Sequence, residues 1–232
     1  MKATINLASF FFLLLVVACS SPEGKKVEAT EAKMPEKTME AAPTAASGQM
    51  ANYMLNKGTL GWTGSKVVGG SAHSGTISVV LGDIRAKGAN IIGGQFTIDM
   101  KSIENTDLPA GKGKEKLEGH LKNSDFFDVE KFPTATFIIT GATPATDVEG
   151  ATHNITGNLT MKDISKSITF PATVAVADNK LTAVSPSFVI DRTQWGIKYG
   201  SGSIVGLAKD KVISNDIALK LNIEATSTAP VQ

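Results

Sequence analysis

Apolar and polar residues alternate with a period of two along most of the chain after Tyr53. A strand with one buried face and one solvated face shows this pattern. Segments of this kind predict eight strands, at residues 60–67, 75–85, 90–100, 134–141, 153–162, 167–176, 181–191 and 216–225. The clearest apolar rows are Ile77/Val79/Leu81, Phe96/Ile98/Met100 and Ile217/Leu219/Leu221.

Turn signals separate the predicted strands. They fall at Gly69-Gly70, Lys87-Gly88, Glu149-Gly150 and Asp178-Asn179. A further pair, Gly93-Gly94, lies inside a strand and predicts a bend or bulge. Eight antiparallel strands suit a closed barrel, because closure removes exposed edges. Such a barrel is either filled by side chains or holds one small ligand. The fold class is therefore all-β, a single eight-stranded antiparallel barrel.

One short helix interrupts the strands at residues 112–123. Leu117 and Leu121 lie four apart and share one face of it. The helix is followed by a corner that contains two adjacent aromatic residues, Phe126 and Phe127. Neighbouring side chains of an extended segment point in opposite directions, so we expect one of them, Phe127, to enter the core. Pro133 then favours an extended residue before it and the start of the next strand.

The N-terminus predicts export and lipidation. Residues 1–18 contain Lys2 followed by an apolar stretch too short to span a bilayer comfortably, as in a signal peptide. The sequence around Cys19 resembles a bacterial lipobox, in which the cysteine becomes the lipidated first residue. Residues 19–50 contain no aromatic residue and are expected to form a disordered tether that reaches roughly 30 Å. The barrel domain is expected at 51–232.

The composition and the positions of the polar residues argue against several classes of function. A net charge of +1 gives no indication of nucleic-acid binding. Cys19 is the only cysteine, so no intramolecular disulfide can form. His73, His120 and His153 are far apart in sequence, and zinc ligands usually occur in closely spaced pairs, so we expect no metal site. No nucleophile elbow or triad is recognisable. We therefore expect neither catalysis nor a cofactor.

Other residues are candidates for binding an amphiphile. Trp62 and Lys66 share one face of a strand with Gly64 between them, which would leave room along a barrel wall; a packed Trp62 and a solvated Lys66 fit equally well. Arg192 could clamp a phosphate or pair structurally with Asp191 or Asp125. His73 could point into the barrel. Phe96, Phe170 and Phe188 form ligand wall only if the barrel is hollow.

A longer signature carries a family resemblance. Residues 120–137 read His-Leu-Lys-Asn-Ser-Asp-Phe-Phe-Asp-Val-Glu-Lys-Phe-Pro-Thr-Ala-Thr-Phe, and residues 98–103, 156–162 and 190–197 agree in order. The chain resembles the YceI-like family over about residues 53–225. The resemblance implies a hollow, lipocalin-like periplasmic barrel that holds a long isoprenoid or acyl chain, without catalysis. The expected ligand-binding residues are then Trp62, Lys66, His73, Phe96, Met100, Phe127, Phe170, Phe188, Arg192 and Trp195.

Together these features predict non-catalytic binding, sequestration or transport of a polyisoprenoid or related lipid at a bacterial envelope membrane. A chain lipidated at Cys19 would be a periplasm-facing or surface lipoprotein, which favours local sequestration over long-range shuttling. Two alternatives stay open: a lipocalin-like enzyme that acts on an isoprenoid lipid, and a filled barrel that serves as a surface interaction module. A homodimer is also left open.

Overall fold

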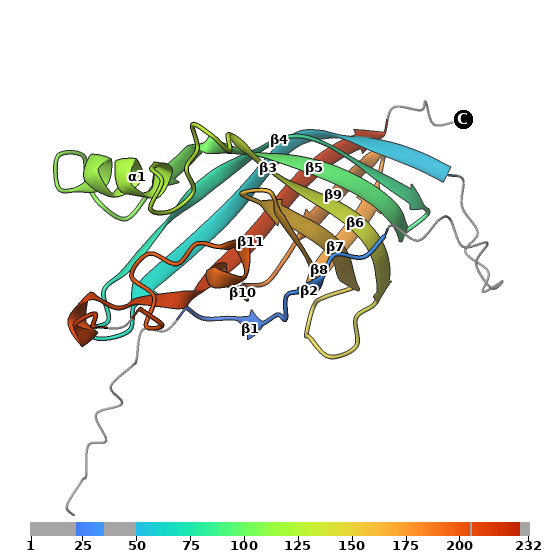
Figure 1. Cartoon of the computed structure of the whole chain (residues 1–232). Helices are drawn as coiled ribbons and strands as arrows, with labels where there is room; N and C mark the ends of the chain where they lie inside the picture. Colours follow the sequence, from blue (N-terminus) through green and yellow to red (C-terminus); the bar gives the residue numbers. More distant parts are fainter. Residues whose placement is uncertain (1–21, 35–49, 205, 228–232) are drawn as a thin grey trace, which may run out of the picture.

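A computed structural model describes the fold of residues 22–34, 50–204 and 206–227 (Figure 1). The predicted signal peptide and Cys19 lie outside these residues. The elements are β1 (Lys25–Lys26), β2 (Thr30–Glu31), β3 (Met50–Lys66), β4 (Ala72–Lys87), β5 (Asn90–Asn105), α1 (Lys114–Lys122), β6 (Thr134–Pro144), β7 (His153–Met161), β8 (Ile164–Ala177), β9 (Lys180–Val184), β10 (Phe188–Asp191), the 3-10 helices η1 (Arg192–Trp195) and η2 (Lys209–Lys211), and β11 (Ile213–Ser227).

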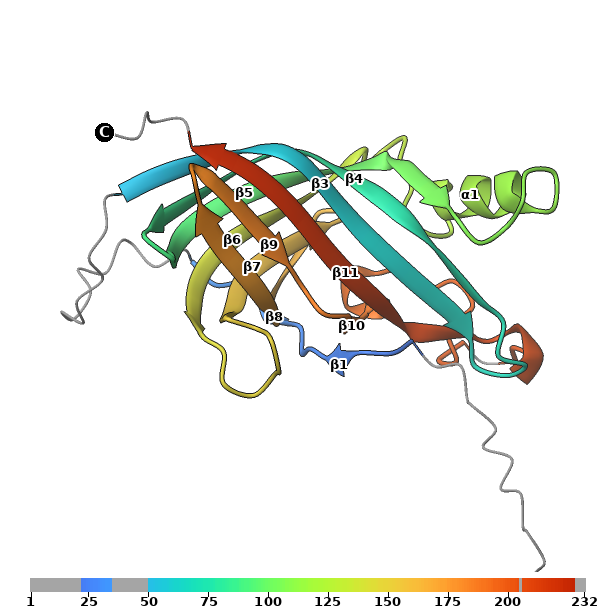
Figure 2. The same ribbon diagram turned by 180° about the vertical axis from the view of Figure 1, so that it is seen from behind.

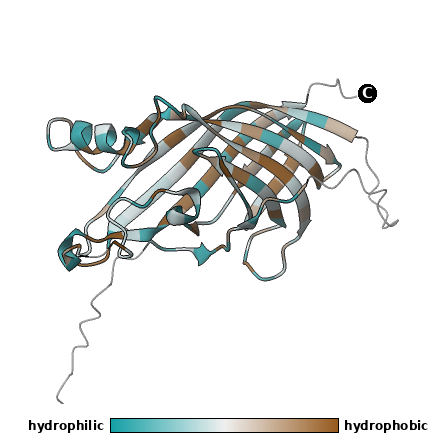
Figure 3. Ribbon diagram, viewed as in Figure 1, coloured by the Kyte–Doolittle hydropathy of each residue, from teal (hydrophilic) through white to brown (hydrophobic). Residues whose placement is uncertain are grey.

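Eight of these strands close into an antiparallel barrel. Strands β3 to β8 pair in sequence order, β9 pairs with both β8 and β11, and β11 returns to β3. Figures 1 and 2 show the strands wrapping around a common interior, with α1 set at one end. This confirms the predicted fold class. In Figure 3, brown hydrophobic bands alternate with paler ones along the strands, as the period-two pattern requires.

The predicted strand at 181–191 is two strands. A break at Ser185, Pro186 and Ser187 divides it into β9 and β10, both of which pair with β11. Proline has no backbone N–H to donate to a ladder, so a strand is readily interrupted there. Beyond the break, β10 no longer pairs with β8, and a seam in the hydrogen-bonded wall separates these two strands.

The N-terminal strap, which we define as residues 22–34, lies in this seam. Its strand β1 pairs with β10 and its strand β2 pairs with β8. Val27 is buried in the core, and its N–H donates to Val189 O at 2.8 Å. At the other end, Lys33 N and Asn158 Oδ1 are 2.9 Å apart. The expectation of a disordered tether is therefore wrong for residues 22–34, which complete the barrel wall.

Several strands are also longer than the pattern predicted. β3 begins at Met50, because its polar first half still pairs with β4 and β11. The turn signals at Gly69, Gly88, Gly150 and Asn179 are confirmed, since each has a positive φ. Arg85 pairs with Gly93 and Ala86 with Ile91, so Ile92 is an extra residue on β5 and forms a bulge next to Gly93-Gly94, where a bend or bulge was expected.

The barrel interior has two halves along its length. A step of two residues along β5, β6 or β11 leads from a wide cavity to a packed end. The steps run from Ile98 to Phe96, from Ala135 to Phe137 and from Leu219 to Leu221. The packed end encloses only about 30 Å³. Its centre is an aromatic stack, in which the Phe170 and Phe188 rings lie 4.5 Å apart at an angle of 8°.

Candidate functional site

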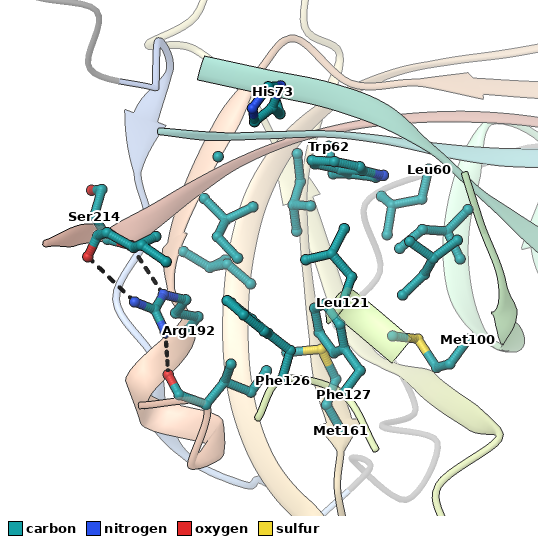
Figure 4. A pocket seen from close by; sticks show the side chains of 18 of the residues that line it. Leu60, Trp62, His73, Met100, Leu121, Phe126, Phe127, Met161, Arg192 and Ser214 are labelled. Carbon is teal, nitrogen blue, oxygen red and sulfur yellow. Dashed lines mark hydrogen bonds between the residues drawn. The ribbon is translucent and has the colours of Figure 1, made fainter. Parts of the chain in front are cut away.

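The wide half of the barrel contains a cavity of about 300 Å³. Its wall comes from the inner faces of β3, β4, β5, β6, β7, β10 and β11 (Figure 4). Most of the lining side chains are aliphatic, for example those of Leu60, Ile77, Ile98, Leu159, Ile190 and Leu219. Because these side chains alternate with outward-facing residues, the strand pattern places an apolar wall around the space. The volume is at the lower end of the range for ligand pockets, about 300–1,000 Å³.

Helix α1 and the corner after it cover one side of the cavity. Leu117 and Leu121 contribute the apolar face of the helix, and both Phe126 and Phe127 follow them into the lining. Phe126 is the more buried, at 7% exposed, whereas Phe127 is half-buried. The expectation that only Phe127 points inward is therefore wrong. The corner is a series of turns rather than a strand, and Asp128 has φ 50°, so alternation does not apply.

An aromatic and polar cluster holds this corner in place. The His120 ring lies 5.0 Å from Phe126 and 4.8 Å from Tyr199, nearly perpendicular to both. Its Nε2 is 3.1 Å from Asp125 Oδ2. Lys162 Nζ donates to Phe126 O at 2.7 Å. His120 is thus a structural residue of the corner, as its position at the end of α1 suggests.

Trp62, Gly64 and Lys66 all line the cavity from β3, as their spacing predicted. The Trp62 indole lies against the backbone of β4 at Gly75; a Cβ added at Gly75 would approach the indole to 2.7 Å. Gly64 leaves open space, since an added Cβ there meets no atom within 4 Å. Lys66 is exposed, with Ser71 O accepting a hydrogen bond from its backbone N–H.

His73 lies on the cavity lining with a carboxylate partner. Its Nδ1 is 2.9 Å from Asp107 Oδ2. Burial raises the pKa of Asp107, but hydrogen bonds from Ser74 N, His73 and Asn105 outweigh it, so the pKa lies below its ordinary value. A charged carboxylate therefore fixes the orientation of His73 on the β4 side of the cavity.

Arg192 is buried beside the cavity and is already bonded. Its Nε, Nη1 and Nη2 donate to the carbonyl oxygens of Ser214, Ile197 and Ile213 at 3.0, 2.8 and 3.3 Å (Figure 4). Asp191 does not clamp it, because that carboxylate accepts from Thr193 N and Oγ1 at 2.9 and 2.6 Å. Burial lowers the pKa of Arg192. These bonds favour the structural role over the phosphate clamp.

The other expected binding residues divide between the two halves of the barrel. Met100 lines the cavity. Trp195 does not; it is fully buried, and its Nε1 donates to Leu159 O at 2.9 Å. Phe96 and Phe170 line the packed end, and Phe188 stacks on Phe170 there. Of the expected apolar rows, Leu81 is 67% exposed, because a register shift between Val79 and Leu81 turns it outward.

Sequence reasoning missed several lining residues. They are Ile103, Phe126, Met161, Ile197, Ile213 and Ser214. Phe126 carried a signal, since two adjacent aromatic residues followed an amphipathic helix. Ile197 and Ile213 flank the long segment between η1 and β11, which has no strand periodicity. The alternation of apolar and polar residues therefore could not predict that these two side chains face the cavity.

Two further features are absent from the described part of the chain. Residues 22–34, 50–204 and 206–227 contain no group of three or more His, Cys, Asp or Glu side chains that could hold a metal ion. Neither is any helix within these ranges long and apolar enough to cross a membrane.

Solved structures show a related fold. BcnA of Burkholderia cenocepacia aligns with a TM-score of 0.50 at 19% identity, over 73% of this chain and 96% of BcnA. A domain from Saccharophagus degradans, described as polyisoprenoid binding and implicated in plant cell wall breakdown, aligns with a TM-score of 0.53 at 14% identity, over 77% of this chain and 99% of that one. At such identities the likeness concerns the fold alone.

Sequence comparison identifies the family. UPF0312 proteins from two Pseudomonas putida strains are each 29% identical to this chain over 133 residues, which is 56% of this chain and 65% of theirs. The matched part is therefore slightly less than two thirds of those relatives. A family model, the YceI-like domain, matches residues 53–225, which is most of the chain. The protein thus belongs to the YceI-like domain family.

Proposed function

We propose that this protein binds a long-chain amphiphile, a polyisoprenoid or related isoprenoid or acyl lipid, inside its barrel without catalysis. The observation that carries the proposal is the cavity of about 300 Å³ with a mostly aliphatic wall. A chain of apolar units gains roughly 25 cal/mol for each Å² removed from water. The polyisoprenoid-binding description of the Saccharophagus degradans domain, which shares the fold, supports the same ligand class.

The cavity also bears on the alternatives. A filled barrel would have side chains in this space, so the cavity counts against a purely structural interaction module. For catalysis, the polar groups near the cavity would have to be free to react. Arg192 is instead engaged with three carbonyl oxygens. The contact with Asp107 uses only Nδ1 of His73, as in histidines that act as general bases, so it does not count against catalysis. The mostly aliphatic lining around these two residues is what favours binding. Of the three functions, lipid binding is therefore the one that best explains an open, mostly aliphatic cavity.

Lipid extraction tests the proposal. The Cys19→Ala chain, which keeps the N-terminal strap, is purified without detergent, extracted with organic solvent and examined by mass spectrometry. We expect a long-chain lipid in a near-stoichiometric amount. Gly64→Phe should abolish its recovery, because the new ring would occupy open space in the cavity.

A matched variant controls for general damage to the barrel. Gly141 lies on β6 away from the cavity, and a Cβ added there also meets no atom within 4 Å. Gly141→Phe should therefore retain the lipid. Absence of lipid from the unmodified cavity, together with no change in melting temperature on adding polyprenyl compounds, would refute the binding proposal.

We further propose that Cys19 is lipidated and holds the barrel at a bacterial envelope membrane. The lipobox-like sequence and the apolar stretch before it support this. One acyl chain alone gives marginal membrane binding, so stable anchoring would need more than one chain on the cysteine. Cys19→Ala should move the protein out of the membrane fraction and remove acyl labelling. Labelling that persists in this variant would contradict the anchor.

A further inference from the structure

One polar atom on the cavity lining is buried without a partner. Trp62 Nε1 has no hydrogen-bond partner among the described residues and is shielded from solvent. An indole N–H can only donate, and a buried tryptophan usually finds an acceptor for it. The second tryptophan does so, since Trp195 Nε1 donates to Leu159 O at 2.9 Å. The unpaired donor at Trp62 therefore requires an explanation.

The direction of this donor is fixed by the wall. The absence of a side chain at Gly75 allows the indole to lie against β4, because an added Cβ would be 2.7 and 2.8 Å from its Cζ2 and Cε2 atoms. In Figure 4 the indole nitrogen lies on the Leu60 side of the ring, away from His73 and Arg192. No described polar side chain is thus in place to accept from it.

A single water molecule is a poor substitute for an acceptor here. A buried water usually needs two to four polar partners. The neighbours of Trp62 on the inner face of the wall are Leu60 on the same strand, Ile77 on β4 and Leu219 on β11. A water held by Trp62 Nε1 would have aliphatic groups on its other sides. An acceptor oxygen carried on an otherwise apolar molecule would pair this donor, once the aliphatic side chains that shield it shift slightly.

We infer that Trp62 recognises the ligand through an acceptor oxygen, so the bound lipid has a hydroxyl, ether, carbonyl or phosphate oxygen that accepts a hydrogen bond from Trp62 Nε1. This inference rests on the proposed function and narrows its ligand class. A plain hydrocarbon and a lipid with only a donor group are excluded as good ligands. Trp62 then acts as a binding residue for the polar end or an internal oxygen of the chain.

Affinity for matched compounds tests the inference. The delipidated Cys19→Ala chain is titrated with an isoprenoid hydrocarbon and with its methyl ether, ketone, monophosphate and ammonium analogues of equal chain length. The methyl ether accepts but cannot donate, so we expect it to bind about tenfold more tightly than the hydrocarbon, a difference of about 1.4 kcal/mol. The ammonium analogue can only donate and should gain nothing. If the ketone or the monophosphate binds more tightly than the ether, the result would support the inference and show which type of acceptor oxygen Trp62 prefers.

The indole signals provide a test that needs no further substitution. The chain has two tryptophans, so two indole N–H resonances are expected. The Trp62 signal should shift downfield with the ether but much less with the hydrocarbon. The Trp195 signal should stay in place with both, because that N–H is bonded to Leu159 O.

Trp62→Phe completes the design, since it keeps an aromatic ring and removes the N–H. The ratio of ether to hydrocarbon affinity should fall from about ten to about one. Equal affinities in the unsubstituted protein, an unmoved Trp62 signal, or a ratio that survives Trp62→Phe would each overturn the inference while leaving lipid binding intact. Failure of every compound to bind would instead overturn the proposed function, and the inference with it.

Discussion

At the scale of single residues, Phe126 connects the cavity with the corner that covers it. One side of its ring lines the cavity, and it also lies 5.2 Å from Tyr199 and 5.8 Å from the Arg192 guanidinium. Because the ring contacts α1 through His120 and η1 through Arg192, it joins two parts of the chain that are distant in sequence.

Phe126→Ala should therefore destabilise the barrel strongly. Truncation of a buried phenylalanine typically costs about 3–5 kcal/mol. Phe127→Ala should cost less, because Phe127 is only half-buried, and the exposed Lys116→Ala should have little effect. Urea unfolding of the three variants measures the difference. A larger loss for Phe127→Ala than for Phe126→Ala would contradict the burial order.

Asp107 should make stability depend on pH in acid. Its folded pKa lies below the ordinary value of 3.8, so its stabilising contribution is fully present above that value and is lost as the pH falls through the folded pKa. Asp107→Asn should therefore reduce stability near neutral pH and show a smaller further loss below about pH 4. Unfolding midpoints between neutral and acidic pH measure this. Asp163→Asn, at an exposed turn residue, should follow the unsubstituted protein throughout.

At the scale of elements, the N-terminal strap is the part of the wall with the fewest ladder bonds. Each of its two strands has only two residues, and Val27 is its one buried side chain in the hydrophobic core. Ion pairs reinforce it at exposed positions, for example Lys26 with Asp216 at 2.7 Å and Lys166 with Glu31 at 2.7 Å. Exposed ion pairs contribute little, so Val27 should dominate its docking.

Val27→Asp should release the strap while leaving the rest of the barrel folded. Burying an unpaired carboxylate is costly, so the segment would leave the seam instead. Amide exchange at Lys33, whose N–H donates to Asn158 Oδ1, should accelerate by at least about tenfold. Glu28→Ala changes the exposed neighbour and should leave this exchange rate unchanged. Unaltered protection in the Val27 variant would mean that backbone pairing alone holds the strap.

The elements also show what the sequence could and could not predict. Period-two rows predicted the barrel and the inward direction of Trp62 and Lys66, because alternation is a local property of any strand. The strap was missed because a single valine among charged residues resembles a tether, and its pairing with β8 and β10 is decided by strands that lie far away in sequence. The inward turn of Phe126 was missed for a related reason, since turns have no fixed alternation.

At the scale of the whole molecule, the packed aromatic end would limit the length of a chain bound as we propose. Phe170 lies between Phe137, at 5.6 Å, and Phe188, at 4.5 Å. These rings occupy the interior immediately beyond the cavity, where the sequence predicted ligand wall. The resemblance implied a hollow barrel but could not show how far the hollow extends, because phenylalanines in an inward row fill space or line it with equal ease.

Phe170→Ala should extend the cavity into the packed end. The loss of a buried ring should reduce stability by about 3–5 kcal/mol. If the proposed lipid binding holds, the variant should also shift its preference toward longer polyprenyl chains, measured by competition between chain lengths. Phe170→Leu retains more of the volume and should shift the preference less. An unchanged chain-length preference in both variants would indicate that the aromatic stack does not limit the ligand.

The docked strap changes how close the barrel would stay to a membrane. Ser187 Oγ donates to Glu23 O, so the chain is fixed to the wall only four residues after Cys19. Four extended residues span at most roughly 14 Å, about half the reach expected for the whole tether. The segment between a lipidated Cys19 and the strap would then be a short linker. It would restrict rotation of the barrel and keep the seam side of the barrel toward the membrane surface. Quenching of a fluorophore placed beside Ser187 by membrane-embedded quenchers would measure this proximity, and the Val27→Asp variant should lose it.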